Sequence, residues 1–379
     1  MIYKDFLGKK LSALGMGTMR LPVIEGDDSK IDEAHAEKMY DYAYEHGVNY
    51  FDTAWGYHGG NSEGMTGRAL AKYPRESYYL ADKFPGYDLA NMGKAEEIFA
   101  EQLNRCGTEY FDFYLIHNVC DLNIAHYLDD EQYGDVSFLR RMKEAGKIRH
   151  LGLSLHGGCD VLERFLAAYG DDVDFCQLQL NWMDWEFQDG RKKVEMLKER
   201  GIAVWVMEPL RGGKLVNLEP EYAEKLESLH PGMSLAEWAL RFQQSVPEVT
   251  VVLTGASSLE QLAENIAVYE EEKPLSREEL DALQEISDAI VGKTAVACTA
   301  CKYCVSHCPI GLDIPKIMSL YNEHVVSGGG FLAPMGLGAM PKDKRPKHCI
   351  ACGACETVCP QQIKVSQVMA DFVERLKRR

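Results

Sequence analysis

Two groups of four cysteines near the C-terminal end have a spacing suited to binding iron. The first group reads C-x2-C-x2-C-x3-C, is followed by proline, and consists of Cys298, Cys301, Cys304 and Cys308. The second group repeats both the spacing and the proline, and consists of Cys349, Cys352, Cys355 and Cys359. Three thiolates on one tight loop can bind three irons of a cubane cluster. The repeated pattern therefore predicts two [4Fe–4S] clusters.

Zinc and disulfides are the alternatives for these cysteines. A structural zinc site uses two separated C-x-x-C pairs and needs no third cysteine three residues further on. Disulfides are rare in reducing compartments, and residues 1–10 lack the apolar run of an export signal. Both alternatives are therefore disfavoured.

The cysteine spacing resembles that of bacterial ferredoxins with two clusters, in which the fourth cysteine of each motif binds the other cluster. The resemblance implies one ligand set of Cys298, Cys301, Cys304 and Cys359. It implies a second set of Cys349, Cys352, Cys355 and Cys308. The other cysteines are expected to be small buried apolar side chains, and they are Cys106, Cys120, Cys159 and Cys176.

Four residues in the first 120 could carry out proton transfer. Asp52, Lys83 and His117 lie at or just past the ends of predicted strands, and Tyr57 follows in the loop after Asp52. Reduction of a carbonyl by hydride leaves an alkoxide that needs a proton, and a tyrosine with a pKa of about 10 is a poor donor. A lysine cation nearby lowers that pKa. Tyr57 is thus predicted to be the general acid and Lys83 the group that tunes it.

The other two residues complete this arrangement. Asp52 is expected to hold Lys83 in place, and His117 is expected to donate a hydrogen bond to the carbonyl oxygen. Each of the four also has a structural interpretation: a loop cap, a half-buried aromatic ring, a solvated charge or a core histidine. Their joint occurrence favours the catalytic interpretation.

Strand-like and helix-like segments alternate through the first 285 residues. The strand-like segments are 11–14, 48–52, 78–82, 111–116, 149–153, 174–180, 202–206 and 249–253. Longer amphipathic segments separate them, including 32–46, 94–106, 137–146, 160–169 and 191–200. Eight such repeats predict an α/β fold with a (β/α)8 TIM barrel over residues 1–285. A doubly wound sheet is the alternative.

Residues 286–379 are expected to form a small, mainly helical, di-cluster ferredoxin-like domain. An acidic helix at 271–293 with Ser276 as its N-cap leads into it. Further helices are expected after Asp313 and over 365–378. The segment 327–347 is rich in glycine and proline and predicts a loop. Its apolar residues could pack on their own domain or form a flap over the barrel mouth.

The barrel segment resembles the aldo/keto reductase family from about residue 3 to residue 270. The catalytic residues lie in FDTAWGYHGGNSE, LADKF and YLIHN, in the order that the family has. Further similarity occurs in YKDFLGKKLSALGMGTMRLP, KIRHLGLSLHG and GASSLEQLAEN. The resemblance implies reduction of a small-molecule carbonyl with NAD(P)H, through Asp52, Tyr57, Lys83 and His117.

The resemblance also implies cofactor contacts. Ser154 and Gln177 should face the nicotinamide carboxamide, and Asn265 should face the adenine. Gly255 and Ala256 should lie near the phosphates, with the loop 210–214 and Arg211 over the pyrophosphate. Pocket residues are expected to include Trp55, His58, Asn118, Trp182, Met207 and Arg211.

This chain departs from the family at several cofactor positions. Leu155 replaces an asparagine, and Met207 replaces the tyrosine that stacks on nicotinamide. Gly255 and Gln261 stand where many members clamp the 2′-phosphate. These departures weaken any preference for NADPH and leave room for another cofactor.

The composition limits the partners. A formal net charge of −17 argues against binding to nucleic acid and to anionic lipid. No segment approaches the roughly 20 apolar residues of a membrane helix. A cytoplasmic protein is expected.

Three functions remain open from the sequence. The first is an oxidoreductase with clusters that exchange electrons with a protein partner, in which a flavin could link one-electron and two-electron chemistry. The second is a reductase driven by NAD(P)H alone, with structural or redox-sensing clusters. The third is a non-enzymatic electron-transfer subunit.

Overall fold

A computed structural model describes residues 1–378 of the chain. The chain divides into two compact units, of which the first spans Met1–Leu283 and the second begins at Gln284. Each unit has its own hydrophobic core. The division lies within helix α13 (Arg277–Thr294), close to the boundary predicted at residue 285.

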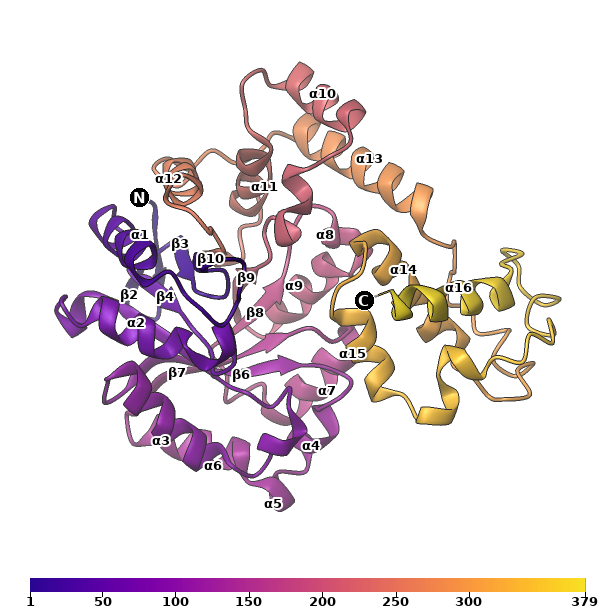
Figure 1. Cartoon of the computed structure of the whole chain (residues 1–379), viewed down its shortest axis with the longest axis horizontal. Helices are drawn as coiled ribbons and strands as arrows, with labels where there is room; N and C mark the ends of the chain where they lie inside the picture. Colours follow the sequence, from indigo (N-terminus) through magenta and orange to yellow (C-terminus); the bar gives the residue numbers. More distant parts are fainter. Residues whose placement is uncertain (379) are drawn as a thin grey trace. The chain divides into compact units, whose positions relative to one another are not determined.

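Eight parallel strands close into a barrel in the first unit, which confirms the predicted TIM barrel (Figure 1). The strands are β3 (Leu14–Gly17), β4 (Tyr50–Asp52), β5 (Tyr79–Phe84), β6 (Phe111–Val119), β7 (Ile148–Leu155), β8 (Phe175–Gln179), β9 (Ala203–Met207) and β10 (Val249–Thr254). Each strand pairs with the next along the chain, and β10 pairs with β3 to close the barrel. Parallel strands of this kind require helical crossovers between them.

The prediction for the first barrel strand is wrong by a few residues. Leu11 and Ser12 belong to β2 (Lys9–Ser12), which pairs antiparallel with β1 (Tyr3–Phe6) in a hairpin. The barrel begins only at Leu14. The apolar run continues from the hairpin into β3, and Phe6 and Leu11 both pack into the core of the barrel. Hydrophobicity alone therefore did not separate the two strands.

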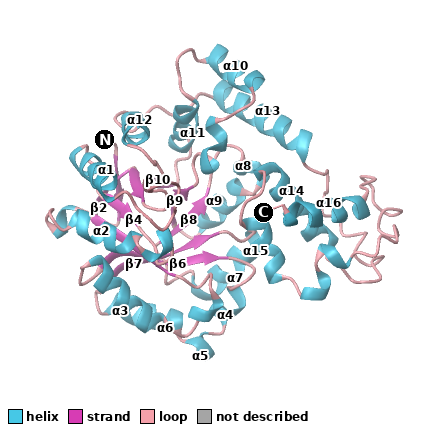
Figure 2. Cartoon of the chain, in the orientation of Figure 1, coloured by secondary structure: helices cyan, strands magenta, loops and turns pink. Residues whose placement is uncertain are grey.

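Helices surround the strands (Figure 2). The principal helices are α1 (Glu33–Glu45), α2 (Ser62–Leu70), α3 (Ala95–Cys106), α6 (Asp135–Glu144), α7 (Cys159–Tyr169), α9 (Gly190–Glu199), α10 (Pro220–Leu229), α11 (Leu235–Gln244) and α12 (Leu259–Val268). Short helices α4 (Ile124–Leu128), α5 (Asp130–Tyr133) and α8 (Asp184–Phe187) lie in the loops. Several of these helices have a side-chain N-cap. At α12, for example, the side chain of Ser258 accepts a hydrogen bond from the backbone N–H of Gln261.

The second unit is helical, and residues 284–378 form no strand. It contains α14 (Ile314–Ser327), α15 (Leu332–Ala339) and α16 (Val365–Lys377). Asp313 caps α14 as expected, by accepting from the backbone N–H of Lys316. Ser276 and Glu279 form a reciprocal capping box at the start of α13. None of the helices within residues 1–378 is long and apolar enough to cross a bilayer.

The predicted loop 327–347 contains a helix, so that prediction is wrong over Leu332–Ala339. Ala333 and Leu337 of α15 are buried in the core of the second unit. A Cβ at Gly336 would lie only 2.5 Å from a methyl group of Leu320 on α14. Glycine therefore permits close packing of two helices here. The composition of the segment alone had predicted a loop.

Candidate functional site

The four residues of the predicted proton-transfer site lie at the carboxyl end of the barrel. Asp52 ends β4, Lys83 lies near the end of β5 and His117 near the end of β6. Tyr57 begins a short 3-10 turn, η1 (Tyr57–Gly60), directly after β4. Carboxyl ends of barrel strands are where TIM barrels build active sites.

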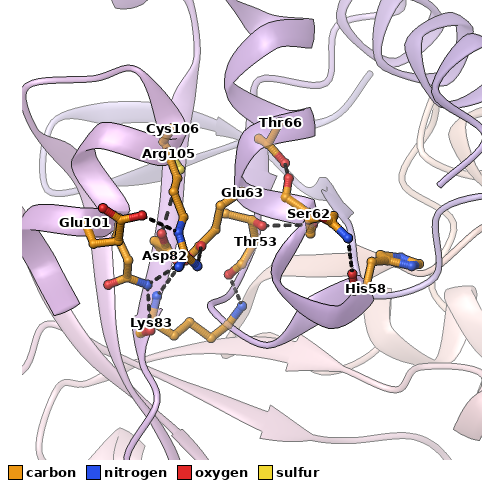
Figure 3. A network of polar contacts seen from close by, with 12 residues as sticks. Thr53, His58, Ser62, Glu63, Thr66, Asp82, Lys83, Glu101, Arg105 and Cys106 are labelled. Carbon is orange, nitrogen blue, oxygen red and sulfur yellow. Dashed lines mark hydrogen bonds and ion pairs between the residues drawn. The ribbon is translucent and has the colours of Figure 1, made fainter. Parts of the chain in front are cut away.

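The structure brings these four side chains together. The Lys83 Nζ donates to Asp52 Oδ1 at 2.5 Å and to the Thr53 carbonyl oxygen at 2.6 Å, and Figure 3 shows the bond to Thr53. The same Nζ lies 4.9 Å from the centre of the Tyr57 ring. The rings of Tyr57 and His117 meet edge to face with centres 6.0 Å apart.

Lys83 and Asp52 form a buried ion pair. Their side chains are 0% and 2% exposed. Burial by itself lowers the pKa of Lys83, but the Asp52 carboxylate and its other neighbours raise it above its usual value overall. Burial raises the pKa of Asp52, against the opposing effect of Lys83. Lys83 is therefore a fixed cation beneath the Tyr57 ring.

The protonation states of Tyr57 and His117 follow from burial as well. Burial raises the pKa of Tyr57, and the charge of Lys83 counteracts this rise without reversing it. The sequence had predicted that Lys83 lowers the pKa of Tyr57, but the pKa of Tyr57 in the folded chain is raised overall. Burial and the charge of Lys83 hold the pKa of His117 well below its usual range. Tyr57 is thus a neutral phenol and His117 a neutral imidazole near pH 7.

His58 has a structural role, contrary to its predicted place in the substrate pocket. The His58 Nε2 accepts from the backbone N–H of Leu21 at 3.1 Å, and its Nδ1 donates to the carbonyl oxygen of Asp28 at 2.8 Å. Both ring nitrogens therefore anchor the loop that carries Tyr57, and the ring is buried.

A polar network behind Lys83 holds its backbone (Figure 3). The backbone N–H of Lys83 donates to Asp82 Oδ1, and its carbonyl oxygen accepts from Gln102 Nε2 on α3. The same Gln102 nitrogen donates to Glu63 on α2 at 2.9 Å, and Glu63 pairs with Arg105 at 2.9 Å. Two helices therefore fix the strand segment that carries the lysine.

This network also contains a buried acid, Asp82. Asp82 is fully buried, and burial together with the nearby Glu63 carboxylate raises its pKa well above the usual range. The guanidinium of Arg105 lies 3.9 Å from the centre of the Trp55 ring, beside the Tyr57 loop. Glu63, Gln102 and Arg105 were not identified from the sequence, since nothing in their spacing distinguishes them from ordinary helix residues.

Tyr87 is a second tyrosine at the site that the sequence did not single out. Its ring meets His117 edge to face with centres 5.1 Å apart. A Cβ on Gly56, the residue before Tyr57, would overlap the Tyr87 hydroxyl oxygen. Burial, followed by the proximity of Tyr57, raises the pKa of Tyr87 to about 12. Its place four residues after Lys83 in the βα loop is the signal that could have found it.

The predicted nicotinamide contacts lie on neighbouring strands, on β7 and β8. The Ser154 Oγ accepts from the backbone N–H of Asn118 at 2.7 Å. Among residues 1–378, no partner is found for the buried Asn118 Oδ1 or the buried Gln177 Oε1. Buried polar atoms of this kind are normally satisfied in the functional protein. Two acceptors for the N–H groups of an amide ligand are thus available, and the residues fit a nicotinamide carboxamide.

Other predicted cofactor residues are engaged with the protein. Gln177 Nε2 contacts the Met207 sulfur at 3.7 Å. Arg211 is 5% exposed, and its Nε donates to both oxygens of Asp184 at 3.1 Å. The charge of Arg211 is therefore directed at Asp184.

An exposed arginine lies near the expected phosphate position. Arg20, in the loop after β3, contacts Glu208 at 3.6 Å and lies next to Gly212 and Gly255. Sequence reasoning had not identified it.

The residue expected to face the adenine is hydrogen-bonded within the protein. Asn265 is buried and donates to Thr254 at 2.7 Å, and the backbone N–H of Ala256 donates to the same hydroxyl.

The eight cysteines of the two motifs form no disulfides and line two cavities in the second unit. The lining of one cavity includes Cys298, Cys301, Cys304 and Cys359. The lining of the other includes Cys349, Cys352, Cys355 and Cys308. The fourth cysteine of each motif thus lies with the first three of the other, and four soft thiolates per cavity fit a [4Fe–4S] cluster.

The sequence matches two family models. The model of the aldo/keto reductase family matches residues 13–288, and that of a 4Fe-4S dicluster domain matches residues 297–363. L-galactose dehydrogenase of Arabidopsis thaliana is 28% identical over 301 residues, which cover 74% of this chain and 90% of that protein. The NADH-specific methylglyoxal reductase of Escherichia coli (strain K12) is 26% identical, over 72% of this chain and 96% of that protein.

A solved structure gives the same result. The apo form of aldo-keto reductase AKR11C1 from Bacillus halodurans aligns with a TM-score of 0.60 and 26% identity, over 76% of this chain and 96% of that chain. The barrel, the grouped side chains and these similarities agree. The chain is an oxidoreductase that belongs to the aldo/keto reductase family and carries a C-terminal 4Fe-4S dicluster domain.

Proposed function

We propose that this oxidoreductase reduces a small-molecule carbonyl, or oxidises the corresponding alcohol, with Tyr57 as the proton donor. The observation that carries the proposal is the buried Lys83, held by Asp52 and the Thr53 carbonyl directly beneath the Tyr57 ring. A cation in this place stabilises the phenolate that remains after Tyr57 has released its proton. Its fixed position means that no reorganisation is needed during the reaction.

His117 orients the substrate in this mechanism. A neutral imidazole can donate one hydrogen bond to the carbonyl oxygen without taking the proton that Tyr57 supplies. Burial keeps the imidazole neutral. The carbonyl oxygen would thus lie between the Tyr57 hydroxyl and the His117 ring, and Trp55 and Tyr87 would flank it.

The residues present fit two kinds of cofactor. Asn118, Ser154 and Gln177 would hold a nicotinamide, and the two sets of four cysteines would hold two [4Fe–4S] clusters. When bound, NAD(P)H supplies a hydride, [4Fe–4S] clusters exchange single electrons, and a flavin could supply both kinds of chemistry. The names of the two relatives, a methylglyoxal reductase and a sugar dehydrogenase, support a small oxygenated carbonyl as the substrate class.

Tyr57→Phe tests the proton-transfer role. The variant is expected to lower kcat with NAD(P)H and methylglyoxal by about 100-fold or more, because general acids contribute roughly 10² to 10⁴ in rate. Tyr44→Phe is the matched control, since its hydroxyl bonds only to Ser77 on the outside of the barrel. Nicotinamide binding, followed by fluorescence, should be unchanged in both variants. Equal kcat in wild type and Tyr57→Phe would refute the proposal.

We also propose that the clusters carry electrons, in preference to a purely structural or redox-sensing role. The exposure of one cysteine in each set, Cys301 and Cys352, supports this proposal because it leaves both cluster sites accessible. Cys352→Ala should abolish turnover driven by a reduced protein donor and spare turnover driven by NAD(P)H. If both kinds of turnover survive, the clusters are structural. Flavin extracted from the anaerobically purified protein would identify the flavin-linked form.

A further inference from the structure

The two cysteine loops of the second unit have matching backbones but differ at one position. Ala300 and Ala351 follow the first cysteine of each loop by two residues, and both have left-handed backbone with φ of 53° and 54°. The residue after the second cysteine is also left-handed in both loops, with φ of 65° at Lys302 and 70° at Gly353. The loops are therefore repeats of one conformation.

Lys302 occupies a position for which glycine is the favourable residue. A left-handed backbone is strained for a residue with a Cβ and nearly free of cost for glycine. The second loop has the unstrained residue Gly353 at this position, whereas the first loop has the strained residue Lys302. Strained residues of this kind concentrate at functional sites, where the strain is maintained for a purpose. Lys302 also lines the cavity of Cys298, Cys301, Cys304 and Cys359.

The loop that carries Lys302 is exposed and apolar at its tip. Cys301 is exposed, and the side chain of Tyr303 is 61% exposed. The other loop has the same feature in Ile350, which is 59% exposed. Exposed aromatic side chains such as Tyr303 are enriched at protein–protein interfaces, and a neighbouring lysine suits the polar rim of such an interface.

The charge of the second unit is opposite to that of the first. Residues 284–379 contain twelve lysines and arginines and eight aspartates and glutamates, a net charge of +4. The whole chain has −17, so residues 1–283 have −21. Three exposed lysines near the cysteine motifs form no ion pair with any carboxylate of residues 1–378, and they are Lys302, Lys342 and Lys347. The charge of a fourth, Lys364, acts on the Glu356 carboxylate.

We propose that the surface around Lys302 and Tyr303 is the docking site for a small, acidic electron-transfer protein. This inference rests on the proposed role of the clusters as electron carriers. Unpaired lysines favour a partner with carboxylates around its own redox group. Physiological salt screens charges beyond about 8 Å, so the partner responds mainly to the residues that it touches. Docking serves the passage of one electron at a time, in which one protein is oxidised as the other is reduced and no bond forms or breaks.

A second copy of this chain fits the surface less well. In a symmetric dimer through this surface, Lys302 of one copy would face the same basic loop of the other, because a two-fold interface pairs a patch with itself. Like charges placed opposite each other disfavour such a contact. An acidic partner meets no such repulsion.

Binding to a defined acidic protein tests the proposal. The anaerobically purified full chain with both clusters is titrated with an acidic flavodoxin by calorimetry, and with basic cytochrome c as a charge control. Lys302→Gly gives the first loop the residue of the second, and Lys302→Glu reverses the charge. Lys10→Glu, on the N-terminal hairpin, makes the same change in net charge elsewhere. Iron content and thermal unfolding are measured for every variant.

The expected result is a Kd for flavodoxin that rises about two- to fivefold in Lys302→Gly, because one exposed ion pair contributes on that scale. Lys302→Glu should bind more weakly still, and Lys10→Glu should match wild type. Basic cytochrome c, which the net charge of −21 on residues 1–283 attracts, should bind wild type and Lys302→Glu alike. Lys302→Gly should keep its iron and unfold at the same temperature as wild type or higher, because glycine relieves the backbone strain.

Several results would overturn the docking site. They are equal Kd values for wild type and Lys302→Glu, no binding of flavodoxin by wild type, or a wild-type dimer in sedimentation that Lys302→Glu dissociates. The third result would assign the surface to a second copy. None of these measurements depends on Tyr57. If flavodoxin binding follows the expected pattern while Tyr57→Phe keeps the kcat of wild type, the proposed carbonyl reduction is refuted. The proposed docking site is then still supported.

Discussion

Removing the charge of Lys83 should destabilise the barrel strongly. Lys83→Met keeps the length of the side chain and removes the ammonium group. Among residues 1–378, the Asp52 carboxylate then loses its hydrogen-bond donor at Oδ1, and Oδ2 already has no partner. A fully buried carboxylate would be left with neither a countercharge nor a hydrogen bond.

The size of the effect follows from the geometry of the pair. At 2.5 Å and an effective dielectric constant of about 20, the attraction between the two charges is about 7 kcal/mol. Much of this offsets the desolvation of both groups, and removal of one partner from a buried pair costs about 3–5 kcal/mol. The second single variant, Asp52→Asn, leaves a buried cation and should cost a similar amount. The double variant leaves no buried charge, so its cost should be smaller than the sum by at least about 2 kcal/mol.

Tryptophan fluorescence in urea is a suitable assay. All five tryptophans lie in the first unit, at positions 55, 182, 185, 205 and 238, so their signal reports the unfolding of the barrel. The pH dependence adds a second measurement. In Lys83→Met the pKa of Asp52 should rise further above its unfolded value of about 3.9. The folded state then binds more protons than the unfolded state, and the free energy of unfolding should fall as the pH rises, by at most about 1.4 kcal/mol per pH unit.

Two results would contradict this reasoning. One is a free energy of unfolding for Lys83→Met within about 0.5 kcal/mol of wild type, which is the range of ordinary surface substitutions. The other is strict additivity in the double variant. Either would mean that the Asp52 carboxylate is solvated or neutral, and that Lys83 is not held by it.

Three other predictions test separate parts of the chain. The double variant Cys304→Ala/Cys359→Ala should retain about four of roughly eight irons per chain if both cysteines bind one cluster. A colorimetric iron assay that finds almost no iron would show that each motif binds its own cluster. Gly56→Ala should lower the melting temperature of wild type but not of Tyr87→Phe, because the new Cβ overlaps the hydroxyl oxygen and lies 3.5 Å from the ring carbon that bears it; equal losses in both backgrounds would exclude this contact. Burial lowers the pKa of His156 to about 4, so stability should fall as the pH drops below about 6.5, where the unfolded histidine gains a proton. Urea unfolding at pH 7 and pH 5 should show a smaller fall for His156→Gln, and an unchanged fall would contradict the assignment.

The parts of the structure that depend on local pattern were predictable. Strand and helix periodicity located seven of the eight barrel strands to within a few residues, because each strand is a short apolar run between amphipathic helices. The end of a strand is also where a barrel places polar side chains. Asp52, Lys83 and His117 could therefore be assigned to one site from three separate segments.

The parts that depend on packing between distant segments were not predictable. Helix α15 forms because Gly336 lets it approach α14 closely, and the sequence shows only a glycine in a glycine-rich segment. Arg211 was expected to serve the pyrophosphate together with the backbone of its loop, and a buried Asp184 also lies within hydrogen-bond distance of its Nε. Neither partner could be chosen from the sequence, since each depends on which side chains the closed barrel brings together.

The same packing explains why the proton-transfer residues need no ligand to assemble. Lys83 is held by four hydrogen bonds, to Asp82 and Gln102 through its backbone and to Asp52 and the Thr53 carbonyl oxygen through its ammonium group. All of these partners belong to the protein, so the position of the cation does not depend on a bound molecule. The groups that would bind a nicotinamide differ, because Asn118 and Gln177 keep buried oxygens without partners among residues 1–378. The chain thus completes the proposed proton-transfer site by itself and leaves the proposed nicotinamide site to be completed by binding.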